Sequence, residues 1–184
     1  MRLTIFLALG AGLVAVPAAA QDTAGVETAS VATTRATFVD AKGNEIGTAS
    51  LMQTSRGVLI DANVSGLPPG EHAFHIHETG RCEAPTFESA GGHYAPRERQ
   101  HGYLATRGPH AGDMPNREIS GNGVLRDQVY NPEVTLSGGD APLLDADGSA
   151  LVIHAKPDDY KTQPSGNAGD RIACAVISKS AAPD

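Results

Sequence analysis

The chain has 184 residues, which is long enough for one domain with a buried core. Its formal net charge of −7 argues against nucleic acid or an anionic membrane as a partner. Glycine (21 residues) and proline (12 residues) are plentiful, and tryptophan is absent. After the N-terminus no long stretch has the apolar spacing of a helix, so we predict an all-β fold of short strands joined by turns.

The first 20 residues have the order of a secretory signal. The basic residue Arg2 precedes an apolar segment, which ends in Pro17 and three alanines. This order predicts a signal peptide at 1–20 that is cleaved on export. The alternative is an uncleaved membrane anchor, which the small residues at the end of the apolar segment disfavour. Cleavage would remove Arg2 and no acid, so the formal charge of −7 would become −8.

Strand-like runs follow a polar lead-in at 21–32. The clearest is Val58–Val64, where apolar and polar residues alternate as in a half-buried strand. Turn signals rich in glycine and proline separate the runs. We predict one folded domain at 33–179 and a frayed tail at 180–184. The other strand candidates are 32–39, 45–53, 70–78, 124–129, 133–136, 150–154 and 172–178.

Two histidines mark the run at 70–78. In a strand, His75 and His77 would share one face, and Phe74 and Ile76 the other. Two imidazoles backed by two large apolar groups indicate the floor of a metal site, although an exposed histidine pair is the simpler alternative. His72 has the wrong parity for that face, so we expect it to support the site from outside or to lie in the core.

A further histidine, His154, ends the strand predicted at 150–154. Together with the paired histidines and one more, it would place four nitrogens around one ion. Such a set suits copper, which binds nitrogen sites most tightly among the divalent first-row metals. By itself, a histidine at the end of a strand is more often structural.

The segment 79–116 is almost without strand signals, and a loop of this length is unusual unless something orders it. His93 follows two glycines, and His101, His110 and Asp113 come within the next 20 residues. Three imidazoles and a carboxylate form a complete tetrahedral set for zinc, whose binding would offset the entropy of the ordered loop. The alternative is a set of solvated histidines in a polar loop.

The chain contains two cysteines, Cys82 and Cys174. One disulfide between them suits an exported protein, with two free thiols as the alternative. A bridge would close a loop of about 90 residues, which the chain-entropy model values at about 4 kcal/mol.

These residues, in this order, resemble the copper/zinc superoxide dismutases. The resemblance covers roughly residues 33–178. It includes the histidine pair, each loop residue named above, His154, both cysteines and the segment Gly166-Asn167-Ala168-Gly169-Asp170-Arg171-Ile172-Ala173-Cys174. It implies an eight-stranded antiparallel Greek-key β-barrel or sandwich. It also implies two long loops, a metal-binding and disulfide loop and an electrostatic loop.

The resemblance also implies roles for individual residues. Asp158 matches a carboxylate that links ligand histidines of the two metals, and Arg171 matches the arginine that holds the anion beside copper. His93 would bridge the metals and deliver a proton. The implied copper ligands are His75, His77, His93 and His154. The implied zinc ligands are His93, His101, His110 and Asp113.

The implied activity is dismutation of superoxide, with one copper and one zinc ion per subunit and superoxide as the substrate. A metal buffer, the dismutase-like domain of a copper chaperone and an inactive relative are the rivals. A complete ligand set together with Arg171 favours the enzyme. The gap of eleven positions from Cys82 to His93 resembles bacterial forms, so the expected compartment is the periplasm, without membrane attachment after cleavage. The run at 138–148 is longer than in familiar members and leaves both monomer and homodimer open.

Overall fold

The computed structural model describes residues 31–179. The predicted signal peptide at 1–20, almost all of the lead-in at 21–32 and the tail at 180–184 lie outside the described residues, so these assignments stay predictions. Within the described part, nine β-strands and one short 3-10 helix form an all-β structure. This helix, η1 (Glu88–Ala90), has three residues, and no described helix is long and apolar enough to cross a membrane.

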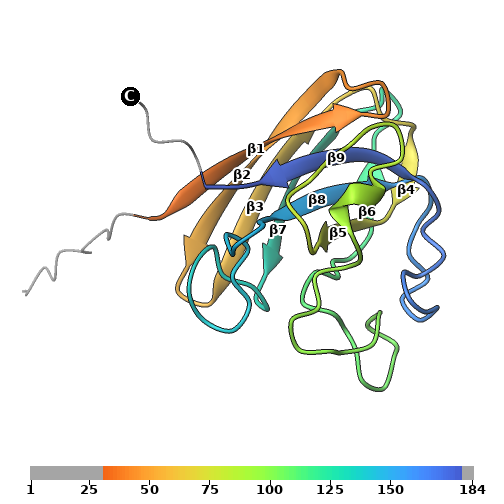
Figure 1. Cartoon of the computed structure of the whole chain (residues 1–184). Helices are drawn as coiled ribbons and strands as arrows, with labels where there is room; N and C mark the ends of the chain where they lie inside the picture. Colours follow the sequence, from red (N-terminus) through yellow and green to blue (C-terminus); the bar gives the residue numbers. More distant parts are fainter. Residues whose placement is uncertain (1–30, 180–184) are drawn as a thin grey trace, which may run out of the picture.

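Seven strands form one antiparallel sheet that curls around its own core (Figure 1). Its strand order is β5-β8-β9-β1-β2-β3-β7. The non-consecutive neighbours confirm an antiparallel sheet with crossover connections. The strands are β1 (Thr33–Asp40), β2 (Glu45–Thr54), β3 (Gly57–Val64), β5 (Phe74–His77), β7 (Leu125–Asn131), β8 (Ser149–His154) and β9 (Arg171–Ile177).

A second, two-stranded sheet pairs β4 (Gly70–His72) with β6 (Arg117–Ile119). Only Ala73 separates β4 from β5, so the predicted run at 70–78 is one chain segment that contributes to both sheets. Ala73 still bonds to the end of β8, because its carbonyl oxygen accepts from the His154 N–H at 2.9 Å.

Two strand predictions were wrong. The segment 133–136 is not a strand: it makes a single bridge, between Thr135 and Pro142, and it buries Val134 and Leu136 as an irregular cover of the core. Its alternating apolar residues therefore reflect burial rather than strand pairing. Conversely, β6 was missed, because a three-residue strand of sequence Arg-Glu-Ile carries no readable alternation.

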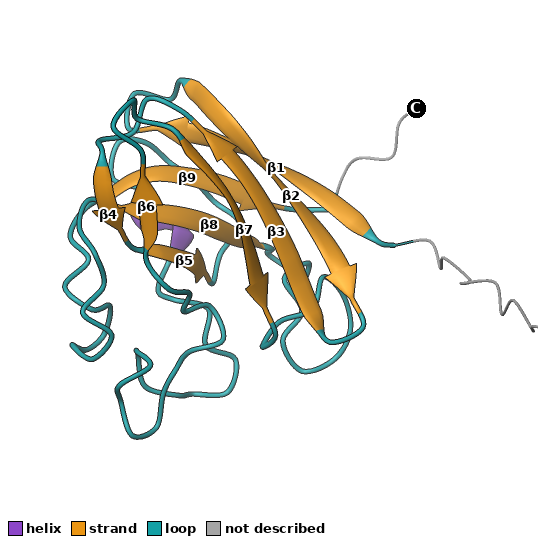
Figure 2. Ribbon diagram, turned by 180° about the vertical axis from the view of Figure 1, so that it is seen from behind, coloured by secondary structure: helices purple, strands orange, loops and turns teal. Residues whose placement is uncertain are grey.

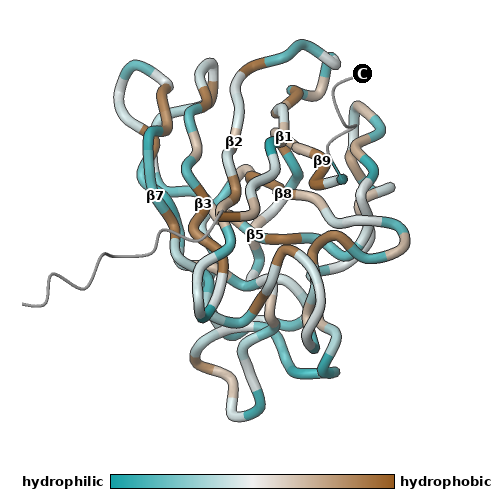
Figure 3. The backbone as a smooth tube through the Cα atoms, turned by 90° about the vertical axis from the view of Figure 1, so that its left-hand side faces the viewer, coloured by the Kyte–Doolittle hydropathy of each residue, from teal (hydrophilic) through white to brown (hydrophobic). Residues whose placement is uncertain are grey.

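The main core lies inside the curled sheet. β3 alternates as predicted, with Val58, Ile60, Ala62 and Val64 buried. A second, smaller cluster of buried residues lies on the other side of β8, where the disulfide loop covers it. For this reason all six residues of β8 are buried. Figure 3 shows hydrophobic residues concentrated along the strands and hydrophilic ones along the loops.

Two long loops extend beyond the sheet on the side away from β1 (Figure 2). One joins β5 to β6 and contains η1, and the other joins β8 to β9. They contact each other directly, since the Leu104 N–H donates to the Tyr160 carbonyl oxygen at 3.0 Å. All residues predicted to hold metals lie in these loops or at the strand ends from which they start.

Candidate metal centre

β5 contributes two histidines to the centre. As the alternation predicts, Phe74 and Ile76 point into the main core, while His75 and His77 point away from it. All four side chains are buried, Phe74 and Ile76 within the main core and the two histidines on the opposite face, which the long loops cover. His154 joins them from the end of β8, the strand paired with β5.

Backbone pairing brings His93 to the free edge of β5. The Tyr94 N–H donates to the Ile76 carbonyl oxygen at 2.9 Å, and His93 forms an isolated antiparallel bridge opposite His77. The loop is therefore placed by a short continuation of the sheet as well as by its side chains.

Asp113 reaches the same edge in the same way. The Ile76 N–H donates to the Gly112 carbonyl oxygen at 2.9 Å, and Asp113 lies opposite His75. A side chain at position 112 would overlap the Ile76 carbonyl oxygen, so glycine is needed for this close approach.

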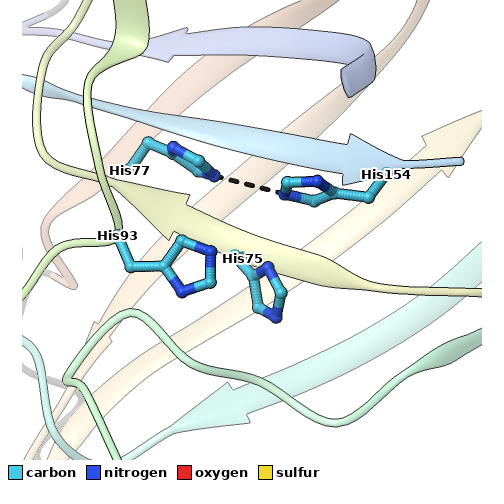
Figure 4. A group of neighbouring side chains, drawn as sticks. All are labelled: His75, His77, His93 and His154. Atoms are coloured by element: carbon cyan, nitrogen blue, oxygen red, sulfur yellow. Dashed lines mark hydrogen bonds between the residues drawn. The ribbon is translucent and has the colours of Figure 1, made fainter. Parts of the chain in front are cut away.

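The first cluster consists of four buried imidazoles, each with a nitrogen within 4.8 Å of the others (Figure 4). The Nε2 atoms of His77 and His154 are 3.3 Å apart. Within the described residues, His75 Nδ1 and His93 Nε2 are buried without a hydrogen-bond partner. Buried nitrogens without partners are costly, and a cation among them would satisfy both. The members of this cluster are His75, His77, His93 and His154.

The second cluster surrounds one oxygen of Asp113. Its Oδ1 lies 2.8 Å from His93 Nδ1, 3.1 Å from His101 Nδ1 and 3.4 Å from His110 Nδ1. Its Oδ2 accepts from the backbone N–H groups of Gly102 at 2.8 Å and His110 at 2.9 Å, which fixes the carboxylate. Three nitrogens and one carboxylate oxygen match the donor set of a closed zinc site.

His93 belongs to both clusters. Its Nδ1 faces Asp113, and its Nε2 has no hydrogen-bond partner among the described residues. One imidazole can thus offer a nitrogen to each of two ions.

A second residue, Asp158, links the clusters from behind. Its Oδ2 lies 3.0 Å from His75 Nε2, and its Oδ1 lies 2.9 Å from His101 Nε2. Each bond occupies the nitrogen that points away from its cluster, so the other nitrogen of each ring is directed toward the cluster. Glycine is needed at 166, because a Cβ there would overlap Asp158 Oδ1.

Arg171 begins β9 beside the first cluster, paired in register with His154. Its half-buried guanidinium donates to the carbonyl oxygens of Phe87 and Gly91, each at 2.6 Å. The Gly91 carbonyl oxygen also accepts from His77 Nδ1 at 3.0 Å. One carbonyl group therefore fixes both the arginine and a histidine of the cluster.

The family model for copper/zinc superoxide dismutase (SODC) matches residues 45–177 of this chain. The chain belongs to the copper/zinc superoxide dismutase family. It is 54% identical over 146 residues to superoxide dismutase [Cu-Zn] 1 of Aquifex aeolicus, covering 78% of this chain and 86% of that one. It is 44% identical over 138 residues to superoxide dismutase [Cu-Zn] of Caulobacter vibrioides, covering 73% and 79%.

A solved structure supports the assignment of the chain to this family. A superoxide dismutase-like protein from Bacillus subtilis superimposes with a TM-score of 0.76 at 38% identity, covering 79% of this chain and 99% of that chain. The predicted fold class is confirmed. Copper and zinc are the metals of this family, and the two clusters provide donor sets that fit them.

The disulfide expected in a copper/zinc superoxide dismutase of this kind is present. Cys82 and Cys174 are bonded across 92 positions of sequence, with their Cα atoms 5.7 Å apart. The bond ties the loop after β5 to β9, three residues beyond Arg171. Because Phe87 and Gly91 lie in that loop, the disulfide also restrains the carbonyl groups that hold Arg171.

His72 joins neither cluster. It is buried, and its Nδ1 lies 2.7 Å from the His154 carbonyl oxygen. Of the two places expected for it, the structure gives the core next to the backbone of His154, in agreement with its parity.

Sequence reasoning missed Asn116, which holds the backbone of Asp158. Its Oδ1 accepts from the Asp158 N–H at 2.8 Å, and its Nδ2 donates to the Asp158 carbonyl oxygen at 3.0 Å. A single asparagine at the end of a polar loop carries no signal for a partner 42 positions away.

Burial favours the neutral form of three histidines in the first cluster, which are His77, His93 and His154. It lowers the pKa of His77 well below its usual value, and neighbouring histidines lower it further. Burial likewise lowers the pKa of His93 to about 4 and that of His154 to about 3. These imidazoles are therefore neutral at pH 7, as metal ligands must be.

The second cluster is electrostatically different. Burial opposes the charged form of His101, but hydrogen bonds to Asp113 and Asp158 raise its pKa to about 9. Burial would likewise raise the pKa of each carboxyl group, yet the hydrogen bonds from the histidines hold both pKa values below the usual range. Without metal, the second cluster contains a protonated histidine between two carboxylates.

Proposed function

We propose that this protein is an exported superoxide dismutase, which converts two superoxide anions and two protons to dioxygen and hydrogen peroxide. The observation that carries the proposal is the pair of buried clusters sharing His93, with unpartnered nitrogens in the first, next to Arg171. Copper held by the four histidines of the first cluster would supply the one-electron redox chemistry that this reaction needs.

The residue roles follow from the two donor sets. Asp158 orients one histidine of each set through the hydrogen bonds described above. The proposed copper ligands are His75, His77, His93 and His154. The proposed zinc ligands are His93, His101, His110 and Asp113.

His93 Nε2 is the atom proposed to carry the proton. Its Nδ1 is directed to the second cluster by Asp113, so the ring would keep its position whether Nε2 faced a metal or held a proton. A proton held at Nε2 faces the first cluster and can pass to the forming peroxide.

Arg171 is proposed to hold the anion. A guanidinium has five N–H donors, and the two recorded bonds to carbonyl oxygens leave further donors for a ligand. These bonds fix the plane of the group, so its remaining donors are preorganised.

Export and a periplasmic location are part of the proposal. The signal-like order at 1–20 supports export, and the disulfide supports an oxidising compartment. N-terminal sequencing of secreted material checks this: a chain starting at Gln21 is expected, and one still starting at Met1 contradicts cleavage.

The activity is tested by measuring superoxide consumption on purified protein whose copper and zinc contents are counted in the same sample. We expect activity in proportion to copper, and loss of it on chelation. Protein that contains one copper and one zinc per chain but does not consume superoxide would be a metal buffer or an inactive relative.

A further inference from the structure

The side-chain amide of Gln163 binds the backbone of His101 on the other long loop. Its Oε1 accepts from the His101 N–H at 2.9 Å, and its Nε2 donates to the His101 carbonyl oxygen at 2.8 Å. One side chain thus satisfies both the backbone N–H and the backbone carbonyl oxygen of His101, as a neighbouring β-strand would.

Further contacts hold the two segments together at this point. The Gly102 backbone lies so close to the Tyr160 carbonyl oxygen that a side chain at 102 would overlap it. The next turn of the loop adds a bond from the Leu104 N–H to the same oxygen, at 3.0 Å. Gln163 Nε2 also donates to the Lys161 carbonyl oxygen at 3.1 Å, which keeps the amide oriented.

The position of the His101 ring depends on this backbone. The ring is fully buried, with Nδ1 directed to Asp113 and Nε2 to Asp158. Because both nitrogens are engaged, the ring has little freedom of its own, and a displaced backbone would pull Nδ1 away from the second cluster. Gln163 itself is exposed and belongs to neither cluster.

We propose that Gln163 is a positioning residue that sets the zinc affinity of the second cluster by fixing the backbone of His101. The inference rests on the proposed zinc ligands. It assigns a metal-dependent role to an exposed glutamine that would otherwise be classed as an ordinary loop residue.

The test compares Gln163→Met, which keeps the length and loses both bonds, with Gln163→Glu, which keeps the acceptor and puts a carboxylate against the His101 carbonyl oxygen. The control is Gln100→Met: Gln100 is also exposed and adjacent to His101, but its side chain makes no hydrogen bond within the described residues. Each protein is prepared with copper(I) in the first cluster. Zinc affinity is then measured by competition with a chromophoric chelator, and the d–d spectrum is recorded after cobalt(II) replaces zinc.

Both Gln163 variants should bind zinc about 10- to 100-fold more weakly, in line with other residues that orient metal ligands, and should shift the cobalt bands. Gln100→Met should match the wild type in both. Wild-type affinity and an unchanged cobalt spectrum in the Gln163 variants would overturn the inference while leaving the proposed function intact. The inference would also be overturned if the Gln163 variants lost as much thermal stability without zinc as with zinc, since the role of Gln163 would then be merely structural. A wild type that binds no zinc would overturn both.

Discussion

At the scale of single residues, the two clusters differ in the protons they hold before metal arrives. The pKa of His101 is raised to about 9, so in the metal-free protein this imidazole is protonated at pH 7. Zinc needs the neutral form, so its binding at pH 7 should release a proton, and its apparent affinity should rise with pH until about 9. Copper added alone to metal-free protein should displace no proton from His93 or His154, whose pKa values lie near 4 and 3, because each neutral ring can then keep its one N–H.

Calorimetry in two buffers of different ionisation enthalpy measures this release, with each metal added alone to metal-free protein. We expect more protons to be released per zinc than per copper at pH 7. Similar proton release for both metals would contradict the assignment of a charged histidine to the second cluster.

His154→Ala tests the copper ligands. Losing one of four nitrogens should reduce activity at least as much as losing an outer hydrogen bond does, by more than about 100-fold. The fold should remain, because the His154 N–H to Ala73 bond belongs to the backbone and survives the substitution. Activity and copper content are measured together with thermal unfolding, and a variant that keeps copper and most of its activity would disprove the assignment.

The residue scale also shows what could be predicted from sequence. The parity of His75 and His77 was enough to predict their shared face, because strand geometry is local. The bonds of Asn116 and Gln163 to partners 42 and 62 positions away could not be predicted, because nothing in the local pattern records them. Residues that can bind metals are few, and their spacing can be recognised in a sequence. The Asn and Gln side chains that support them occur in many loops and have no such pattern.

At the scale of structural elements, the loop between β5 and β6 is ordered in two ways. Its residues pair with the edge of β5, and its side chains converge on Asp113. His110→Ala removes one proposed zinc ligand and leaves the pairing. We therefore expect faster hydrogen exchange across 79–116 and a melting temperature lower by about 5 °C or more, with a smaller effect on the rate per bound copper.

Hydrogen exchange followed by mass spectrometry resolves the loop from the sheet, and zinc content is measured on the same sample. Normal stability in a variant that has lost its zinc would mean that edge pairing alone orders the loop.

The predictions for β6 and for the segment 133–136 failed because backbone pairing depends on how the elements come together in the fold. β6 exists because its three residues find β4, and so its pairing is set by tertiary structure. The segment 133–136 has strand-like composition but follows Pro132 and bends back on itself, with the Thr135 hydroxyl donating to the Gly138 carbonyl oxygen at 2.5 Å. Alternation predicts which side chains are buried and cannot say whether the backbone pairs.

At the scale of the whole molecule, an acidic protein must attract an anion. The formal charge of −7 repels superoxide at long range, so attraction needs local positive charge, and Arg171 is its proposed source. Exposed charges are screened beyond about 8–10 Å at ordinary ionic strength. Arg171→Ala should therefore lower the rate by about 10-fold or more and flatten its dependence on added salt.

The matched control is Arg126→Ala, which removes an exposed arginine from β7, at the opposite edge of the sheet from β5. Rates are compared at several salt concentrations and at equal copper content. Equal rates and equal salt slopes for Arg171→Ala and the wild type would remove Arg171 from the mechanism.

The alternation within β5 also limits how genes of this kind can change in length. Inserting or deleting one codon between His75 and His77 would turn one of them into the core and bring an apolar side chain toward the metals. The segment between Cys82 and His93 has no alternation to preserve, although it must hold the carbonyl groups of Phe87 and Gly91 against Arg171 and return His93 to the edge of β5. That loop can therefore change in length by single residues wherever these carbonyl groups keep their places, whereas β5 can change only by substitution.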